Sequence, residues 1–562
     1  MRGEDSASTA QHLQAQHRAR WRSAALLLWR LADLLGLPAL LVCIIILSRL
    51  IAWPYGFDMG DEGYFNVVAW KMLDGWALYA DLQSVYTPGL HLLHAAIFRL
   101  LEPSVYYGKA ITVCTMVPVG LLLYFLLRLY IHPLLAFLGV CYLPAVANGY
   151  YPGHVFVFGA LLLLACRGYQ RSLLAQWCVG LLVGLAILSK AEVGLAGLGG
   201  VLLATLLLTR SGRGLRSLLP TLRPIASLLF GVAVPVGAFV IYEVVRGRWN
   251  DIFYFLAVAP RRWGKMLAAT RRLPPVFPPR GTGMVFVFRF LRYLDFYSAL
   301  LLVPLGLAVL AWRLHQHRAS QAEKALLGTA VVTGLLMLLV LTARDVYHLH
   351  SCRLPGLVVE AFLFVWGLKW IIARFRRASQ AAQLLWIGPA LVWLAVATLW
   401  TGRLPDYLIL FSHTLAAGQP GSDPAEAALL RLWERPDLPH AGPIRLPPDE
   451  SRMWEQAVAY VKHNSRPAPS VFVAPGAPGL YFFAERDPPT RFLLFYPGMV
   501  DKAHEQEILR DLTDARIDLV AFNWPPEDNF CGQSFADQCP TLYRWIAANF
   551  RWDATIGVFR FY

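Results

Sequence analysis

The distribution of apolar residues along the chain predicts a polytopic α-helical membrane protein. Apolar runs separated by short polar gaps fill residues 31–402, and most of them approach the roughly 20 residues that cross a bilayer. We expect about eleven transmembrane helices, at 31–53, 110–131, 134–146, 154–166, 173–188, 193–208, 224–244, 298–312, 325–341, 354–372 and 384–400. The first run has no small-residue cleavage site after Trp53, which favours an uncleaved span.

Two of these runs, 134–146 and 154–166, are short. At ~1.5 Å per residue, each helix would reach only about 20 Å, less than the thickness of the hydrocarbon layer. We therefore expect the pair to turn around at the sequence NGYYPG inside the membrane and to leave a wet cavity above the turn.

The pattern changes after residue 402, where Pro, Asp, Glu and Gly become frequent and span-length apolar runs end. Residues 403–450 read as a linker, and 451–562 read as a small three-layer α/β domain. Its periodicity predicts helices at 454–462, 479–485, 502–515 and 542–550, and strands at 470–474, 491–495, 518–522 and 556–562. The APGAPG turn lacks the Lys and Ser of a nucleotide-binding loop.

Composition agrees with a membrane protein, since the 562 residues are 57% hydrophobic and 15% charged, with a mean hydropathy of +0.47. The net charge of +15 does not indicate a nucleic-acid partner, because the basic residues fall mostly in the gaps between apolar runs. The basic gaps 128–132, 167–171, 210–223, 313–324 and 374–377 predict the cytoplasmic side, together with the N-terminal tail 1–30. The loop 54–107 and the C-terminal domain are then extracytoplasmic.

The candidate chemistry begins in this first external loop, where residues 56–64 read GFDMGDEGY. Asp58, Asp61 and Glu62 stand at the edge of the membrane, although a solvated acidic loop would look the same. A helical stretch follows at 64–73, and then an aromatic segment that contains Tyr86 and Pro88 and ends in a short helix. This arrangement predicts a loop folded back onto the bilayer surface.

The order of acidic pair, surface helix, Pro-Gly and short helix resembles the first external loop of the GT-C membrane glycosyltransferases. These include the protein O-mannosyltransferases and the lipid A aminoarabinose transferases, and the nearer likeness is to their bacterial polyprenyl-phosphate-sugar-dependent relatives. The resemblance implies that Asp61 is the general base that takes the proton of an acceptor hydroxyl. Glu62 would shape the catalytic site, and substrate contacts would come from Asp58, Tyr64, Tyr86 and Pro88.

Two positions depart from the family pattern. Thr87 precedes Pro88 where the aminoarabinose transferases have a lysine, and Lys109 enters the second span where many relatives have an arginine. The ligands of a donor phosphate are therefore expected elsewhere in the chain.

The external loop 245–297 is rich in arginine and includes Arg261, Arg262 and Lys265. Such a loop binds lipid headgroups or captures the phosphate of a lipid carrier. A second external segment contains Arg344, His348 and Arg353, which we expect to contact phosphate. His348 and His350 would also suit a metal, but no second ligand cluster accompanies them, so the sequence does not indicate a metal cofactor.

Lys190 and Glu192 lie on an external turn, where they either pair with each other or contact a substrate. Five of the eight cysteines lie in apolar runs, and Cys352 lies near the start of another. Cys531 and Cys539 flank a short polar loop in the C-terminal domain, and we expect them to form a disulfide in an oxidising compartment.

An external site cannot use cytoplasmic nucleotide sugars, so its glycosyl donor would have to be carried by a lipid and be anionic. A polyprenyl-phosphate-linked hexose or pentose meets both conditions. The prediction is an inverting glycosyltransferase of the bacterial inner membrane, acting on a hydroxyl of an envelope glycan, lipid or protein. A transporter and a non-catalytic envelope-assembly subunit remain alternatives, although no inverted repeat is visible in the sequence.

Overall fold

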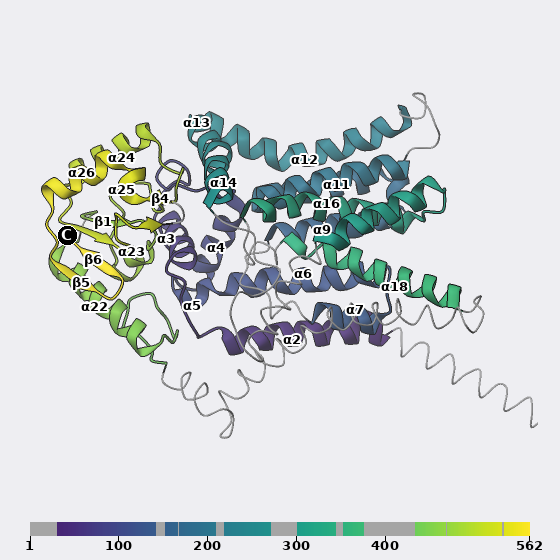
Figure 1. Cartoon of the computed structure of the whole chain (residues 1–562), viewed down its shortest axis with the longest axis horizontal. Helices are drawn as coiled ribbons and strands as arrows, with labels where there is room; N and C mark the ends of the chain where they lie inside the picture. Colours follow the sequence, from purple (N-terminus) through teal and green to yellow (C-terminus); the bar gives the residue numbers. More distant parts are fainter. Residues whose placement is uncertain are drawn as a thin grey trace, which may run out of the picture.

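The computed structural model describes residues 31–141, 152–166, 168–209, 219–270, 300–343, 352–375, 433–467, 469–530 and 533–562. It consists of a bundle of long helices with a small α/β domain at one end (Figure 1). The expected span 384–400 and most of the turn NGYYPG lie outside the described residues, so the cavity expected above that turn stays a prediction.

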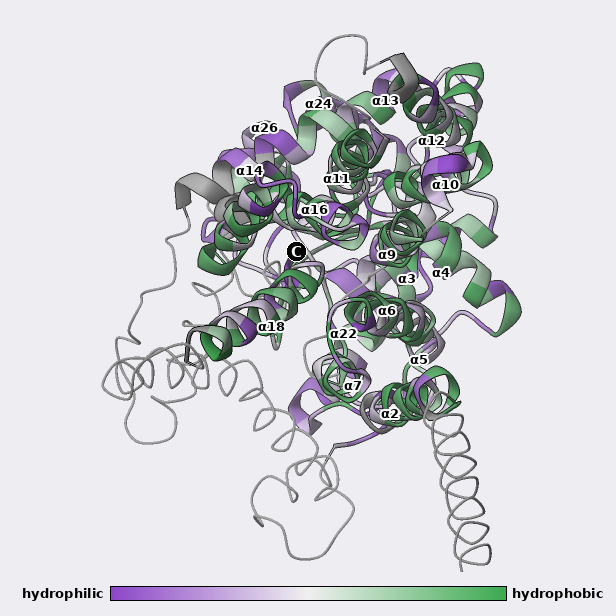
Figure 2. Cartoon of the chain, turned by 90° about the vertical axis from the view of Figure 1, so that its right-hand side faces the viewer, coloured by the Kyte–Doolittle hydropathy of each residue, from purple (hydrophilic) through white to green (hydrophobic). Residues whose placement is uncertain are grey.

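The helices of the bundle follow the apolar runs of the sequence. They are α2 (Leu37–Ala52), α6 (Ala110–Arg128), α7 (Pro133–Val140), α9 (Pro152–Ala165), α10 (Leu173–Ser189), α11 (Ala191–Thr209), α12 (Leu219–Val245), Leu300–His315, α16 (Gln321–Ala343) and α18 (Gly356–Phe375). Within the described residues, six helices are long and apolar enough to cross a membrane, and three shorter ones are also apolar. Figure 2 looks along the bundle and shows that hydrophobic residues dominate these helices. The chain is a multi-pass membrane protein.

Small residues let some of these helices approach closely, as they do in other membrane bundles. A Cβ built on Gly328 of α16 would lie only 2.7 Å from the carbonyl oxygen of Gly200 in α11. The two backbones therefore touch where neither helix has a side chain.

Short helices lie at the end of the bundle nearest the C-terminal domain (Figure 1). The first external loop forms α3 (Asp61–Leu73), α4 (Pro88–Leu100) and α5 (Val105–Gly108). The basic loop begins with α13 (Trp249–Phe253), the π-helix η4 (Tyr254–Val258) and α14 (Ala259–Thr270). The surface helix thus begins earlier than expected, which places Asp61 and Glu62 in its first turn.

The C-terminal domain confirms the expected α/β class. Its helices are α22 (Pro448–Asn464), α23 (Gly479–Ala484), α24 (Lys502–Ala515), α25 (Phe535–Gln538) and α26 (Pro540–Asn549). Its strands are β1 (Val471–Ala474), β2 (Leu519–Phe522), β3 (Asn529–Phe530), β4 (Gln533–Ser534), β5 (Ala554–Ile556) and β6 (Phe559–Phe561). The main sheet has the order β1-β2-β6-β5, with β1 and β2 parallel and the other pairs antiparallel, and β3 and β4 form a separate hairpin.

Two strand predictions were wrong in this domain. Residues 491–495 are mostly buried but join no sheet, because their backbone bonds go to loops: Phe495 N donates to Pro475 O, and Arg491 O accepts from Gln83 N. Residues 556–562 do not form one strand, because the chain reverses at Gly557, whose φ is +57°.

The first external loop and the C-terminal domain share one hydrophobic core. Tyr64 and Phe65 of α3 belong to the same cluster of buried residues as Trp454 of α22 and Phe472 of β1. The bundle has a separate core. Residues 433–447, expected to be part of a loose linker, pack against the first loop, since Gly56 N donates to Arg445 O.

Candidate functional site

The acidic turn predicted as the catalytic loop is the N-terminus of α3. Oδ1 of Asp58 accepts hydrogen bonds from the backbone N–H groups of Gly60 and Asp61, at 2.9 and 3.1 Å. In return, Asp58 N donates to Oε2 of Glu62 at 3.1 Å. This reciprocal arrangement resembles a capping box, in which two side chains satisfy the unpaired donors that begin a helix. Asp58 and Glu62 thus fix the turn on which the exposed Asp61 stands.

Glu62 is further held by Lys109, which comes from the start of α6. The Lys109 ammonium lies 3.9 Å from Oε2 of Glu62 and donates to the carbonyl oxygens of Tyr55 and Gly56. The Glu62 side chain is 26% exposed. Burial raises the pKa of Glu62, and the positive charge of Lys109 opposes that shift. These contacts give Glu62 and Lys109 a shaping role in the turn.

Tyr64 and Tyr86 belong to the same part of the first loop. Tyr64 is buried, and its hydroxyl donates to Gln83 O at 2.6 Å, while the hydroxyl of Tyr79 donates to Tyr86 O at 2.8 Å. Burial raises the pKa of Tyr86, and the charges of Asp61 and Glu192 add to that rise. The ring centroids of Tyr64 and Tyr86 lie 6.2 Å apart, so Tyr86 packs against the helix that begins at Asp61.

Pro88 begins α4 beside the turn between α10 and α11. A Cβ built on Gly89 would lie 2.8 Å from Leu188 O, which shows how closely the two segments approach. Lys190 and Glu192 pair with each other across 3.6 Å, the first of the two alternatives left open by the sequence. The structure thus places Pro88 at the start of α4 beside the turn that carries Lys190 and Glu192.

The C-terminal domain also reaches this site, which the sequence did not predict. A Cβ built on Gly60 would lie 3.7 Å from the hydroxyl oxygen of Tyr496 and 3.6 Å from Gly476 O. Tyr496 follows the buried run 491–495 in the sequence FYPG, which indicates a turn but not its partner.

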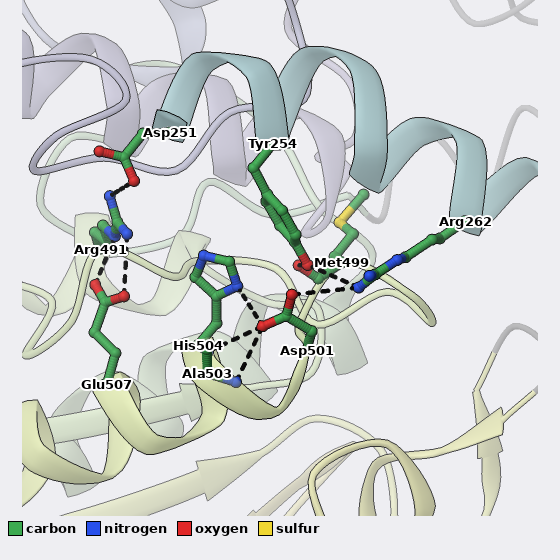
Figure 3. A network of polar contacts seen from close by, with 9 residues as sticks. All are labelled: Asp251, Tyr254, Arg262, Arg491, Met499, Asp501, Ala503, His504 and Glu507. Carbon is green, nitrogen blue, oxygen red and sulfur yellow. Dashed lines mark hydrogen bonds and ion pairs between the residues drawn. The ribbon is translucent and has the colours of Figure 1, made fainter. Parts of the chain in front are cut away.

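The basic side chains of α14 lie farther along the same end of the molecule. Arg261, Arg262 and Lys265 are exposed. Arg262 lies 3.4 Å from Asp501 of the C-terminal domain and donates to the hydroxyl of Tyr254 (Figure 3). Their role in phosphate binding stays a prediction, and Arg262 already has a protein carboxylate as a neighbour.

The other predicted phosphate ligands are only partly described. Arg344 and His348 lie outside the described residues. Arg353 is buried and forms a bidentate ion pair with Glu360. The Nε–Oε1 distance is 3.0 Å and the Nη2–Oε2 distance is 2.8 Å. The exposed fractions of these two side chains are only 5% and 2%, so any phosphate at Arg353 would share the guanidinium with Glu360.

The thiol of Cys539, one of the two cysteines predicted to form a disulfide, is fully buried. Cys531 lies outside the described residues. The disulfide therefore stays a prediction, and Cys539 belongs to the same hydrophobic core as Phe535 and Leu542. Among the described residues, no three or more His, Cys, Asp or Glu side chains come together as a metal site.

Comparison of the chain with protein-family models and with curated proteins gives no match. Solved structures do match. ArnT from Cupriavidus metallidurans, bound to undecaprenyl phosphate, is 12% identical, with 94% of this chain and 97% of that chain covered and a TM-score of 0.50. A second match is the archaeal oligosaccharyltransferase AglB from Archaeoglobus fulgidus, in complex with an inhibitory peptide and a dolichol-phosphate. It is 13% identical, the match covers 87% of this chain and 69% of that chain, and the TM-score is 0.46. The likeness to ArnT extends over the bundle and the C-terminal domain, and it shows that this chain has a GT-C-like fold.

Proposed function

We propose that the chain is a membrane glycosyltransferase that moves a sugar from a polyprenyl-phosphate carrier to a hydroxyl of an envelope glycan, lipid or protein. The observation that supports this most is the position of Asp61. Its carboxylate stands at the exposed start of α3, on a turn fixed by Asp58 and Glu62, and Tyr496 of the C-terminal domain lies beside the neighbouring Gly60. The ArnT structure with the same type of fold holds undecaprenyl phosphate, which is a lipid of the proposed donor class.

The proposed reaction is a single displacement. Asp61 accepts the proton of the acceptor hydroxyl while the acceptor oxygen attacks the anomeric carbon. The bond from that carbon to the phosphate oxygen breaks, and the polyprenyl phosphate leaves with the electron pair. Attack from the side opposite the leaving group inverts the anomeric configuration. A positioned base contributes typically ~10²- to 10⁴-fold to such a rate.

The departing phosphate gains negative charge, so cationic groups near it would stabilise the transition state. Arg261, Arg262, Lys265, Arg344 and His348 are proposed for this role. Arg353 is a weaker candidate, because Glu360 already neutralises its charge.

The proposed location is the bacterial inner membrane, with the N-terminus in the cytoplasm and the C-terminal domain outside. The positive-inside rule supports this orientation. The basic gap 128–132 follows the end of α6 that is away from Lys109 and the first external loop. The basic gap 313–324 lies beside it, since Tyr130 Oη donates to Ala322 O and Gln321 Nε2 donates to Cys166 O.

The test compares Asp61→Asn with Glu62→Gln in proteoliposomes that contain undecaprenyl phosphate carrying a labelled hexose or pentose. Asp61→Asn keeps the shape of the side chain but cannot accept a proton at neutral pH, so transfer should fall by ~10² or more. Glu62→Gln should reduce transfer less, because an amide oxygen can still accept from Asp58 N. Both variants should retain wild-type protein levels and donor-lipid binding.

Near-normal turnover by the Asp61→Asn protein would remove the general-base role. Movement of the labelled lipid across the bilayer without any transfer of sugar would favour a transporter instead.

A further inference from the structure

Arg491 of the C-terminal domain joins three segments that are far apart in the sequence. Its Nη1 donates to Oδ1 of Asp251 in α13 at 2.9 Å and to the carbonyl oxygen of Tyr79 in the first external loop at 3.1 Å. Nε lies 2.7 Å from Oε1 of Glu507, and Nη2 donates to its Oε2 at 3.0 Å. Figure 3 shows the guanidinium between Asp251 and Glu507, which come from opposite sides of the contact.

The surroundings of Arg491 suit the guanidinium of an arginine better than the ammonium of a lysine. The side chain is only 13% exposed, and its guanidinium carbon lies 5.5 Å from the ring centroid of Phe255 and 5.4 Å from that of Phe492. A planar group with donors on several edges can bond to three partners while its faces meet aromatic rings. A lysine ammonium has one nitrogen and cannot reach all three partners together.

On one side, the contacts of Arg491 lead to the catalytic turn. Its guanidinium holds the backbone of Tyr79, whose hydroxyl donates to Tyr86 O. Its own carbonyl accepts from Gln83 N at 2.8 Å, and Gln83 O accepts from the Tyr64 hydroxyl. The loop between Tyr79 and Tyr86 is thus fixed to the C-terminal domain at two points, and through Gln83 it is bonded to α3, the helix that begins at Asp61.

On the other side, Arg491 anchors the basic helix. Asp251 lies in α13, which continues through η4 into α14, the helix that carries Arg261, Arg262 and Lys265. A second set of contacts strengthens this attachment: the Tyr254 hydroxyl donates to Met499 O, and the Tyr254 ring lies 4.2 Å from that of His504. Both sets are visible in Figure 3.

We propose that Arg491 is a positioning residue for the transfer reaction. It holds the Tyr79–Tyr86 loop and α13 against the C-terminal domain. Because Tyr64 of α3 donates to Gln83 O in that loop, Arg491 also keeps the helix that begins at Asp61 in place, while it fixes the start of the basic helix. This role rests on the proposed function, but the attachment itself can be measured without any sugar transfer.

The first experiment measures amide hydrogen exchange of the full-length protein in lipid nanodiscs. Arg491→Met should raise exchange in segments 79–86 and 249–258 at least tenfold and leave β1 and α24 protected. Arg491→Lys should lie between this variant and the wild type. The matched control is Arg486→Lys, a buried arginine of the same domain that donates to Ser465 and Ala484 within that domain. Unchanged exchange in both segments of Arg491→Met would overturn the proposal.

The second experiment measures kinetics with undecaprenyl phosphate carrying a labelled hexose or pentose. Arg491→Lys should lower kcat about 10-fold, with the KM values changed less, because misplaced reacting groups lose rate more than binding. Asp251→Asn should also lower kcat in the wild type, but it should have little further effect in the Arg491→Met protein. Arg486→Lys should match the wild type.

The two experiments separate this proposal from the proposed function. If the wild-type protein transfers no sugar, the proposed function fails, and the proposal that Arg491 positions the transfer fails with it, while exchange still reports the attachment. If exchange rises in the Arg491 variants but kcat stays at the wild-type value, the attachment is real and its positioning role is refuted.

Discussion

At the scale of single residues, three neighbouring carboxylates have different tasks because they stand at a helix start. The backbone N–H groups there need acceptors, and Asp58 supplies one while Glu62 bonds back to Asp58 N. Asp61 occupies the first helical position, where its side chain is exposed. The sequence GFDMGDEGY cannot show this division, since all three acids are chemically alike.

Two buried histidines make the stability of the first loop depend on pH. Nε2 of His94 donates to Oδ1 of Asn66 at 3.0 Å, and His91 bonds to the Ser84 hydroxyl at 2.7 Å. Nδ1 of each ring has no hydrogen-bond partner within the described part of the chain. Burial lowers the pKa of both histidines to about 3 from an ordinary value of 6.5.

Because these pKa values are lower in the folded protein, the unfolded chain takes up more protons below pH 6.5. The stabilisation is fully present above pH 6.5 and is lost as the pH falls toward 3, by up to about 1.4 kcal/mol per pH unit for each histidine. Between pH 7 and pH 4, the Tm of His94→Gln should therefore fall less than the Tm of the wild type. The glutamine amide can still donate to Asn66. Equal losses in both proteins would contradict the assignment.

At the scale of elements, the position of the acidic turn at the start of α3 depends on one close contact between helices. A Cβ built on Gly63 of α3 would lie 2.8 Å from Gly479 N at the start of α23. The contact is backbone against backbone, so neither side can move a side chain away. It joins the helix that begins at Asp61 directly to the C-terminal domain.

Gly63→Ala should therefore destabilise the protein by about 1–3 kcal/mol, as overpacking does in other cores, and should reduce transfer as well. Gly237→Ala in α12 is the matched control, because a Cβ there would meet nothing within 4 Å. It should be neutral or stabilise by about 0.5–1 kcal/mol, since alanine is the better helix former. The comparison needs only thermal unfolding in detergent, and equal Tm values for the two variants would rule out the close contact.

At the scale of the whole molecule, the first external loop, the basic loop and the C-terminal domain form one assembly at one end of the bundle (Figure 1). The first loop shares its core with the C-terminal domain, and Arg491 and Arg262 connect the basic loop to that domain. The candidate site therefore draws on three segments that are far apart in the sequence.

This arrangement predicts that Arg452 and Asp61 lie on one side of the membrane and Gln316 on the other. In a background without exposed native thiols, cysteines at 61 and 452 should react with an impermeant maleimide in intact cells. A cysteine at 316 should react only after the membrane is opened. Labelling of positions 61 and 452 from opposite faces would overturn the proposed site.

The sequence by itself determined the membrane class, the positions of most helices and the C-terminal α/β class. Span-length apolar runs have few other stable states in lipid, because every backbone polar group must be bonded within the helix. The same local rules placed α24 at its observed bounds.

The tertiary structure alone decided which groups meet at the site. Residues 491–495 read as a strand because apolar runs look alike wherever they are buried, yet their bonds go to loops from other parts of the chain. Tyr496 and Arg491 reach the first external loop only because that loop and the C-terminal domain share a core. No local sequence pattern identifies a partner that lies hundreds of residues away. The burial of Cys539 and the pairing of Arg353 with Glu360 were likewise set by packing, which no spacing in the sequence expresses.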